Sequence, residues 1–129
     1  MNIWHAPIVR ILRQSGLFAR VQLLGGKVRA FFSETLFLDI HYDPTSGSYS
    51  YAMIDLTLPS PGDKRLFGWD DCPHPDYSAL TGLKGYPHHF QERLPDGSWQ
   101  FSESNFRGDI EKEICEVIEI VRQRTSGDE

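Results

Sequence analysis

The sequence is poor in cysteine and has no long apolar run. Only Cys72 and Cys115 occur in 129 residues, which is little basis for the disulfide framework of a small secreted domain. No uninterrupted apolar stretch approaches the roughly 18 residues of a membrane span. The N-terminus also lacks the basic, apolar and small-residue order of a signal peptide. We therefore expect a cytoplasmic protein with no membrane segment.

Acidic residues are missing from the first quarter of the chain. The formal net charge is -5, but residues 1–33 carry five Lys and Arg and no Asp or Glu, so all 18 acidic residues follow them. An acidic total argues against nucleic acid, which favours clustered cations. The basic first quarter could instead form a surface that contacts phosphates. The alternative is that these cations are the solvated faces of one helix and two strands.

The length and a 40% hydrophobic content predict a single domain over residues 1–129. Apolar residues alternate with polar ones, between turn-forming glycines and prolines, in most of the segments that we expect to be strands. The expected strands are residues 17–23, 27–32, 36–42, 48–58, 64–70, 86–94 and 98–101. Residues 71–85 show no useful periodicity and are expected to form a long surface loop, a length that is typical of mobile or functional loops.

Helical spacing occurs at both ends of the chain. Pro7 at a first helical position and Gly16 after the last turn predict a helix of about ten residues. Asp109 is the expected N-cap of a C-terminal helix that Gly127 follows, and Cys115 is expected to be a small core residue of that helix. The predicted fold class is α+β: a twisted antiparallel sheet, built as a meander of hairpins, with both helices packed on it.

Titratable side chains gather in two segments on either side of the long loop. Asp70 precedes it and His74 lies near its start, while His88 and His89 follow it. If strands flank the loop, its two ends meet and these four side chains can approach one another. Cleavage of RNA without a metal needs a group that accepts a proton, a group that donates one and a cation for the phosphorane charge. Imidazole suits both proton transfers near neutral pH.

Two other interpretations of this cluster remain open. Cys72, His74 and His88 could bind zinc, although the Cys-x-His spacing is not a common zinc pattern and adjacent histidines on a strand point to opposite faces. The histidines could also hold the loop closed through hydrogen bonds to the backbone. In either case the protein would be a non-catalytic binding or regulatory module.

Residues 67–75 (FGWDDCPHP), followed by residues 86–89 (YPHH), resemble the TumE-like toxins of bacterial and archaeal toxin–antitoxin loci. That family carries an aromatic-Asp-Asn-x-Pro-His-His stretch and, further on, an aromatic-Pro-His-His stretch. A Tyr-x-Tyr strand, here residues 49–51, and a C-terminal helix extend the likeness. The resemblance implies a toxin that acts on RNA and is neutralised by a cognate antitoxin. The matching residues are Asp70, Pro73, His74, Pro87, His88 and His89.

The clustered histidines, the basic first quarter and this resemblance together predict a small metal-independent ribonuclease without a cofactor. Its predicted catalytic residues are Asp70, His74, His88 and His89. His88 or His89 would be the general base and His74 the general acid, and Asp70 would orient an imidazole. The candidates for binding RNA phosphate are Arg65, Arg29, Arg20 and Tyr86. The expected partners are RNA and the antitoxin, and the choice between a monomer and a homo-oligomer is left open.

The chain departs from the family pattern at several positions. Gly68 stands where the family usually has Arg, Asp71 where it has Asn, and Pro75 in place of the second His of the first stretch. If the family's Arg binds phosphate, Arg65 or the N-terminal cations must replace it here. Otherwise the departures weaken the activity or leave a catalytically dead relative that binds only the antitoxin.

Overall fold

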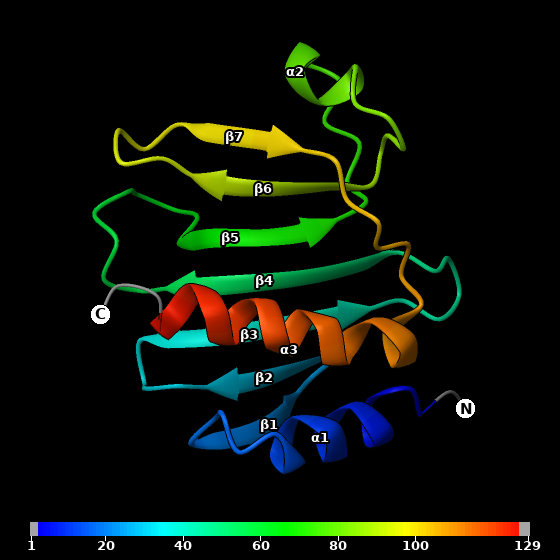
Figure 1. Cartoon of the computed structure of the whole chain (residues 1–129), viewed down its shortest axis with the longest axis vertical. Coiled ribbons are helices and arrows are strands. Elements are labelled where there is room, and N and C mark those ends of the chain that lie inside the picture. Colours follow the sequence, from blue (N-terminus) through cyan, green and yellow to red (C-terminus); the bar gives the residue numbers. More distant parts are fainter. Residues whose placement is uncertain (1–2, 127–129) are drawn as a thin grey trace.

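The computed structural model describes residues 3–126, which form a seven-stranded antiparallel sheet with one helix near each end of the chain (Figure 1). The strand order β1-β2-β3-β4-β5-β6-β7 follows the sequence, which confirms the predicted α+β meander. The strands are β1 (Arg20–Leu24), β2 (Lys27–Phe31), β3 (Leu36–Tyr42), β4 (Tyr49–Asp55), β5 (Arg65–Asp70), β6 (His89–Arg93) and β7 (Trp99–Ser102). The helices are α1 (His5–Gln14), α2 (Ser78–Thr81) and α3 (Ile110–Ser126).

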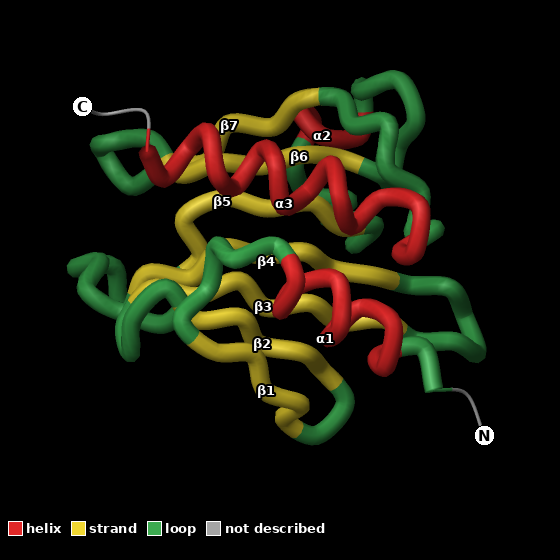
Figure 2. Tube along the Cα trace, turned by 60° about the horizontal axis from the view of Figure 1, so that its bottom comes forward, coloured by secondary structure: helices red, strands yellow, loops and turns green. Residues whose placement is uncertain are grey.

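Both long helices pack on the same face of the sheet, as Figure 2 shows. In α1 the buried positions are Ile8 and Leu12, four residues apart. In α3 they are Ile110, Ile114, Val117, Ile118 and Val121, which form one apolar stripe. Cys115 lies one position off that stripe and is exposed, so the prediction that it is a core residue is wrong. Gly127, expected to follow α3, lies outside the described residues.

The expected strands are present, but several of their ends differ. The segment predicted as an irregular loop contains the short helix α2, which contacts β7. Strand β6 begins at His89 rather than Tyr86, because Pro87 has no N–H for the ladder and the His88 N–H bonds to the Gly85 carbonyl within a turn. The missing N–H and this turn together exclude the first three predicted residues, 86–88, from the strand. None of the helices within residues 3–126 has the length and apolar content needed to cross a bilayer.

The two faces of the sheet differ in composition. Side chains on the face that carries α1 and α3 form the apolar core, among them Tyr51, Met53 and Trp69. The opposite face, here called the open face, carries the cross-strand row Ser50, Asp70 and His89 from β4, β5 and β6. Within the described residues, neither long helix covers the open face. The alternation of side chains along β5 and β6 therefore places the predicted acid and histidine on the uncovered side.

Candidate functional site

Asp70 and His89 occupy opposite positions on neighbouring strands and contact each other. Asp70 is the last residue of β5, His89 is the first of β6, and the two form a cross-strand pair. The distance from His89 Nε2 to Asp70 Oδ1 is 3.3 Å. The Asp70 residue is 5% exposed and the His89 residue is fully buried. Two segments that are distant in sequence thus meet because antiparallel pairing aligns the end of one strand with the start of the next.

His74 reaches the same place from the loop. The backbone from Cys72 to Tyr77 closes successive turns, with the His74 N–H on the Cys72 carbonyl and the Tyr77 N–H on the His74 carbonyl. These turns bring the His74 ring to within 6.1 Å of the His89 ring, centroid to centroid. One donor atom each from Asp70, His74 and His89 all lie within 4.8 Å of one another. Three of the four predicted catalytic side chains therefore converge.

Both ring nitrogens of His89 have partners. Nδ1 lies 2.8 Å from the Pro87 carbonyl oxygen, which can only accept, so Nδ1 carries a proton. Nε2 is 2.8 Å from Oε1 of Gln91, besides its contact with Asp70. Nε2 is consequently the ring nitrogen that faces the carboxylate. Gln91 was not among the predicted site residues, although its place two residues after His89 on a strand puts both on one face.

Arg65 supplies the positive charge of the site. Its Nη1 donates to Asp70 Oδ2 at 2.6 Å and its Nη2 donates to Ser50 Oγ at 3.3 Å. A register shift between β4 and β5 places Arg65 opposite Ile54. Gly68 is the open-face position between Arg65 and Asp70, so no side chain obstructs the guanidinium on its way along the strand. A Cβ at position 68 would lie 2.5 Å from the Tyr51 carbonyl oxygen. This backbone thus excludes the Arg that the resemblance places at position 68.

A pocket of about 270 Å³ opens beside these groups. Its lining combines the charged pair Arg65 and Asp70 with the imidazole of His74 and with aromatic rings. The full lining is Asp63, Arg65, Asp70, Cys72, His74, Tyr77, Gln91, Trp99 and Phe101. The rings of Tyr77 and Phe101 lie 5.3 Å apart, and Phe101 also meets the edge of His89 at 5.7 Å. Charged, titratable and flat apolar groups therefore converge in one recess, although no sequence signal distinguished Tyr77 or Phe101.

His88, the fourth predicted catalytic residue, is bound elsewhere. Its Nδ1 lies 3.0 Å from the hydroxyl oxygen of Tyr49, whose hydroxyl donates to the Phe106 carbonyl, also at 3.0 Å. The His88 and Tyr49 rings stack at 5.8 Å. Burial, and secondarily the charge of Arg107, lower the pKa of His88. His88 thus joins the start of β6 to the segment before α3, while His89 is buried against Asp70, which lines the pocket.

Asp71 and Cys72 also have defined surroundings. Asp71 accepts a hydrogen bond from Ser48 Oγ at 2.8 Å, which fastens the turn before β4. The Cys72 N–H donates to Asp70 Oδ1 at 2.9 Å. Burial, together with the charges of Asp70 and Asp71, raises the pKa of the Cys72 thiol. Cys72 lines the pocket, but neither it nor His88 belongs to the group of converging donor atoms.

The N-terminal cations lie apart from this pocket. Arg29 on β2 pairs with Asp39 at 2.7 Å, and Arg20 on β1 pairs with Glu34 at 2.7 Å. Three strand spacings of about 4.8 Å separate β2 from β5, so Arg29 is roughly 14 Å away across the sheet. Tyr86 is half-buried and precedes Pro87 through a cis peptide bond. Of the four predicted phosphate-binding residues, Arg65 is the one that contacts Asp70.

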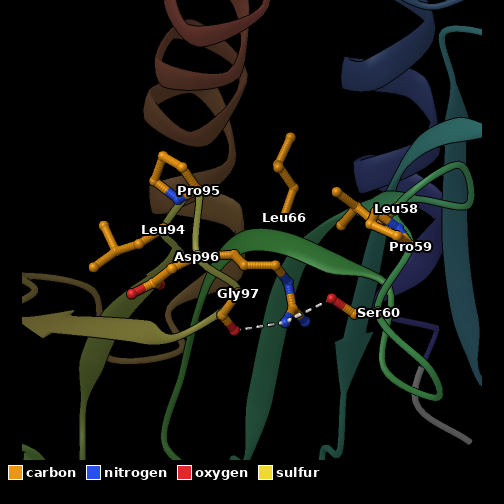
Figure 3. A pocket seen from close by; sticks show the side chains of 9 residues that line it. Leu58, Pro59, Ser60, Leu66, Leu94, Pro95, Asp96 and Gly97 are labelled. Atoms are coloured by element: carbon orange, nitrogen blue, oxygen red, sulfur yellow. Dashed lines mark hydrogen bonds between the residues drawn. The ribbon is translucent and has the colours of Figure 1, made fainter.

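A second hollow, of about 430 Å³, lies between the β4–β5 connection and the β6–β7 turn (Figure 3). Leu58, Leu66 and Leu94 give it a largely apolar lining. Arg93 crosses it and donates to Ser60 Oγ at 3.4 Å and to the Gly97 carbonyl at 3.2 Å. The lining contains no histidine or cysteine, and its carboxylate, Asp96, accepts hydrogen bonds from the N–H and Oγ of Ser98 in the β6–β7 turn.

No protein-family model matches the chain, and no curated protein or solved structure matches it. The structure itself shows an α+β meander with a recess on the open face that is lined by the Asp70 carboxylate, the His74 imidazole and the Arg65 guanidinium, with the buried His89 imidazole in contact with Asp70.

Proposed function

We propose that the protein is a small metal-independent ribonuclease that acts as the cytoplasmic toxin of a toxin–antitoxin pair. The observation that carries the catalytic part is the convergence of Asp70, His74 and His89 beside Arg65 on the open face. The toxin part rests on the resemblance of residues 67–75 and 86–89 to TumE-like toxins. RNA and an antitoxin are accordingly the proposed partners.

The reaction is an attack by the ribose 2′-oxygen on the adjacent phosphorus. Asp70 lines the pocket and takes the 2′-hydroxyl proton, with His89 behind it as a positioning residue that contacts Oδ1. The 2′-oxygen forms its bond to phosphorus, and the bond from phosphorus to the 5′-oxygen breaks. His74, the half-buried imidazole in the pocket lining, donates a proton to the departing 5′-oxygen. The products are a 2′,3′-cyclic phosphate and a 5′-hydroxyl.

Arg65 is the residue proposed to stabilise the additional negative charge of the phosphorane. Its guanidinium is mostly buried, with 18% of the side chain exposed, so its field is only partly screened by water. It carries further N–H groups besides those directed at Asp70 and Ser50. Tyr77 and Phe101 offer ring faces on which a base next to the cleaved bond could stack.

The catalytic proposal is tested with purified protein and single-stranded RNA in EDTA. Wild-type protein should produce cyclic-phosphate ends, and His74→Ala should reduce the rate by about 10²-fold or more, the usual contribution of a general acid. His41→Ala is the matched control, because His41 is an exposed histidine on β3. Intact RNA in the presence of folded wild-type protein would overturn the proposal, as would equal rates for the two variants.

The toxin proposal needs an experiment in cells. Induced expression should arrest growth, co-expression of the neighbouring gene should restore it, and His74→Ala should not arrest growth at equal protein level. Growth arrest by His74→Ala that is as strong as the arrest by wild type would show that toxicity does not depend on the pocket. If soluble wild-type protein did not arrest growth, the toxin assignment would be contradicted. The RNA assay would still test the ribonuclease activity separately.

A further inference from the structure

We infer that Asp70, His74 and His89 form a binding site for one divalent transition-metal ion of the zinc class. Two imidazoles and a carboxylate are a ligand set that such ions accept, and three protein ligands leave a position for water or a substrate oxygen. The group is the one set of three or more His, Cys, Asp and Glu donors within residues 3–126 whose atoms lie this close together.

Two of the three donor atoms already have the required separation. Zinc binds imidazole nitrogen and carboxylate oxygen at about 2.1 Å, so two ligands of a tetrahedral ion lie about 3.4 Å apart. His89 Nε2 and Asp70 Oδ1 are 3.3 Å apart. His74 stands on the loop after β5, and its donor atom lies within 4.8 Å of both. Closing these separations to about 3.4 Å by a movement of the His74 side chain would complete the set.

The surroundings of His89 and Asp70 match those of metal ligands. A histidine that binds a metal usually donates its other ring N–H to a carbonyl or carboxylate, which fixes the tautomer and the ring. His89 does this through Nδ1 and the Pro87 carbonyl, at 2.8 Å. Arg65 holds Asp70 Oδ2 and the Cys72 N–H holds Oδ1, so the carboxylate cannot turn away. Binding of the ion would replace the contact between Nε2 and Gln91.

This site uses the atoms that the proposed ribonuclease needs for proton transfer, and in that respect the inference rests on the proposed function. An ion on His74 and Asp70 would occupy both the acid and the base. Zinc should therefore inhibit RNA cleavage, and EDTA should restore it. Cleavage that instead disappears in EDTA and returns with zinc would support the metal site and contradict the metal-independent reaction.

Metal binding is measured without RNA, on untagged full-length protein freed of metal by a chelator. Zinc is titrated against a chromophoric chelator, and we expect one ion per chain. His74→Ala should weaken binding at least ~10-fold, since it removes a ligand from the loop without touching the buried pair. His41→Ala should leave binding unchanged. No binding, or equal binding by wild type and His74→Ala, would overturn the inference.

Cobalt(II) distinguishes this set from one that contains the thiol. A site of two imidazoles and a carboxylate should give visible ligand-field bands without the charge-transfer absorption of a thiolate. Cys72→Ser should then leave the affinity unchanged, and Asp70→Asn should lower it. A thiolate band, or loss of binding in Cys72→Ser, would show that Cys72 is a ligand and would contradict the proposed set.

Discussion

The carboxylate of Asp70 and the imidazole of His89 are cross-strand neighbours on β5 and β6, with Oδ1 and Nε2 3.3 Å apart. Both side chains are almost completely enclosed, and both have further partners. The pair is therefore part of the structure of the sheet as well as of the candidate site. Removal of a neighbouring charge should consequently be detectable as a loss of stability, independently of any activity.

Arg65→Met should lower the free energy of unfolding by about 3 kcal/mol, because it leaves the buried Asp70 carboxylate without its cation. Urea denaturation followed by tryptophan fluorescence measures the change. The double variant Arg65→Met/Asp70→Asn should recover part of the loss, since it also removes the unpaired charge. Arg10→Met, at an exposed position of α1, is the control. A similar small effect of Arg10→Met and Arg65→Met would contradict the ion pair.

Gly68→Ala should destabilise the protein by about 2 kcal/mol, in the range of overpacking substitutions. The added Cβ would lie 2.5 Å from the Tyr51 carbonyl oxygen, and backbone must move to accept it. Gly26→Ala provides a matched control, because no atom outside the turn lies within 4 Å of a Cβ there and its φ is not positive. Thermal denaturation of the two variants side by side tests the difference, and equal melting temperatures would refute it.

Tyr51→Phe should cost about 1.5 kcal/mol, the usual scale for a hydrogen bond to a charged group. The Tyr51 hydroxyl donates to Glu113 Oε1 at 2.7 Å, and Glu113 also accepts from the N–H groups of Arg107 and Gly108 before α3. Burial raises the pKa of Tyr51, so the hydroxyl remains a donor across the working pH range. A double-mutant cycle with Glu113→Ala should give a coupling energy well above zero. Additive effects would show that the two residues do not interact.

His88 should make stability depend on pH below neutrality. Its pKa in the folded protein is lowered from about 6.5, so the unfolded chain takes up this proton first as the pH falls. The free energy of unfolding therefore decreases as the pH falls below about 6.5 and levels off below the folded pKa. In EDTA, His88→Asn should flatten this slope relative to wild type, whereas His41→Asn should not. An unchanged slope in His88→Asn would assign the effect to another group.

Much of the fold follows from patterns that are short in range. The alternation of apolar residues, the turn formers between strands and the helical stripe from Ile114 to Val121 predicted every long element in order. The short helix α2 was not expected, because residues 78–81 have no amphipathic repeat. Cys115 was misplaced because its apolar neighbours do not reveal that it stands one position off the buried stripe.

The candidate site was only partly predictable. The proximity of Asp70, His74 and His89 was expected from the closed ends of the loop, but the choice between His88 and His89 depended on the register of β6. The role of Arg65 depends on the register shift beside Ile54 and on the absence of a side chain at Gly68, and neither is visible as a motif. Gln91 and Phe101 were missed because they too belong to no motif, and their position beside the site depends on the register of β6 and β7.

The meander places every strand beside its neighbours in sequence, so most of the sheet is assembled by short chain closures. The exception is the connection from Asp71 to His88, the longest between two strands. Because the entropic cost of closure rises with loop length, pairing of β5 with β6 is the most costly closure in the sheet. That pairing also brings Asp70 to His89. We therefore expect the pairing of β5 with β6 to be the slowest strand pairing in the sheet and to form the pocket at the same time. Pulsed hydrogen exchange at the β6 amides during refolding can follow this step.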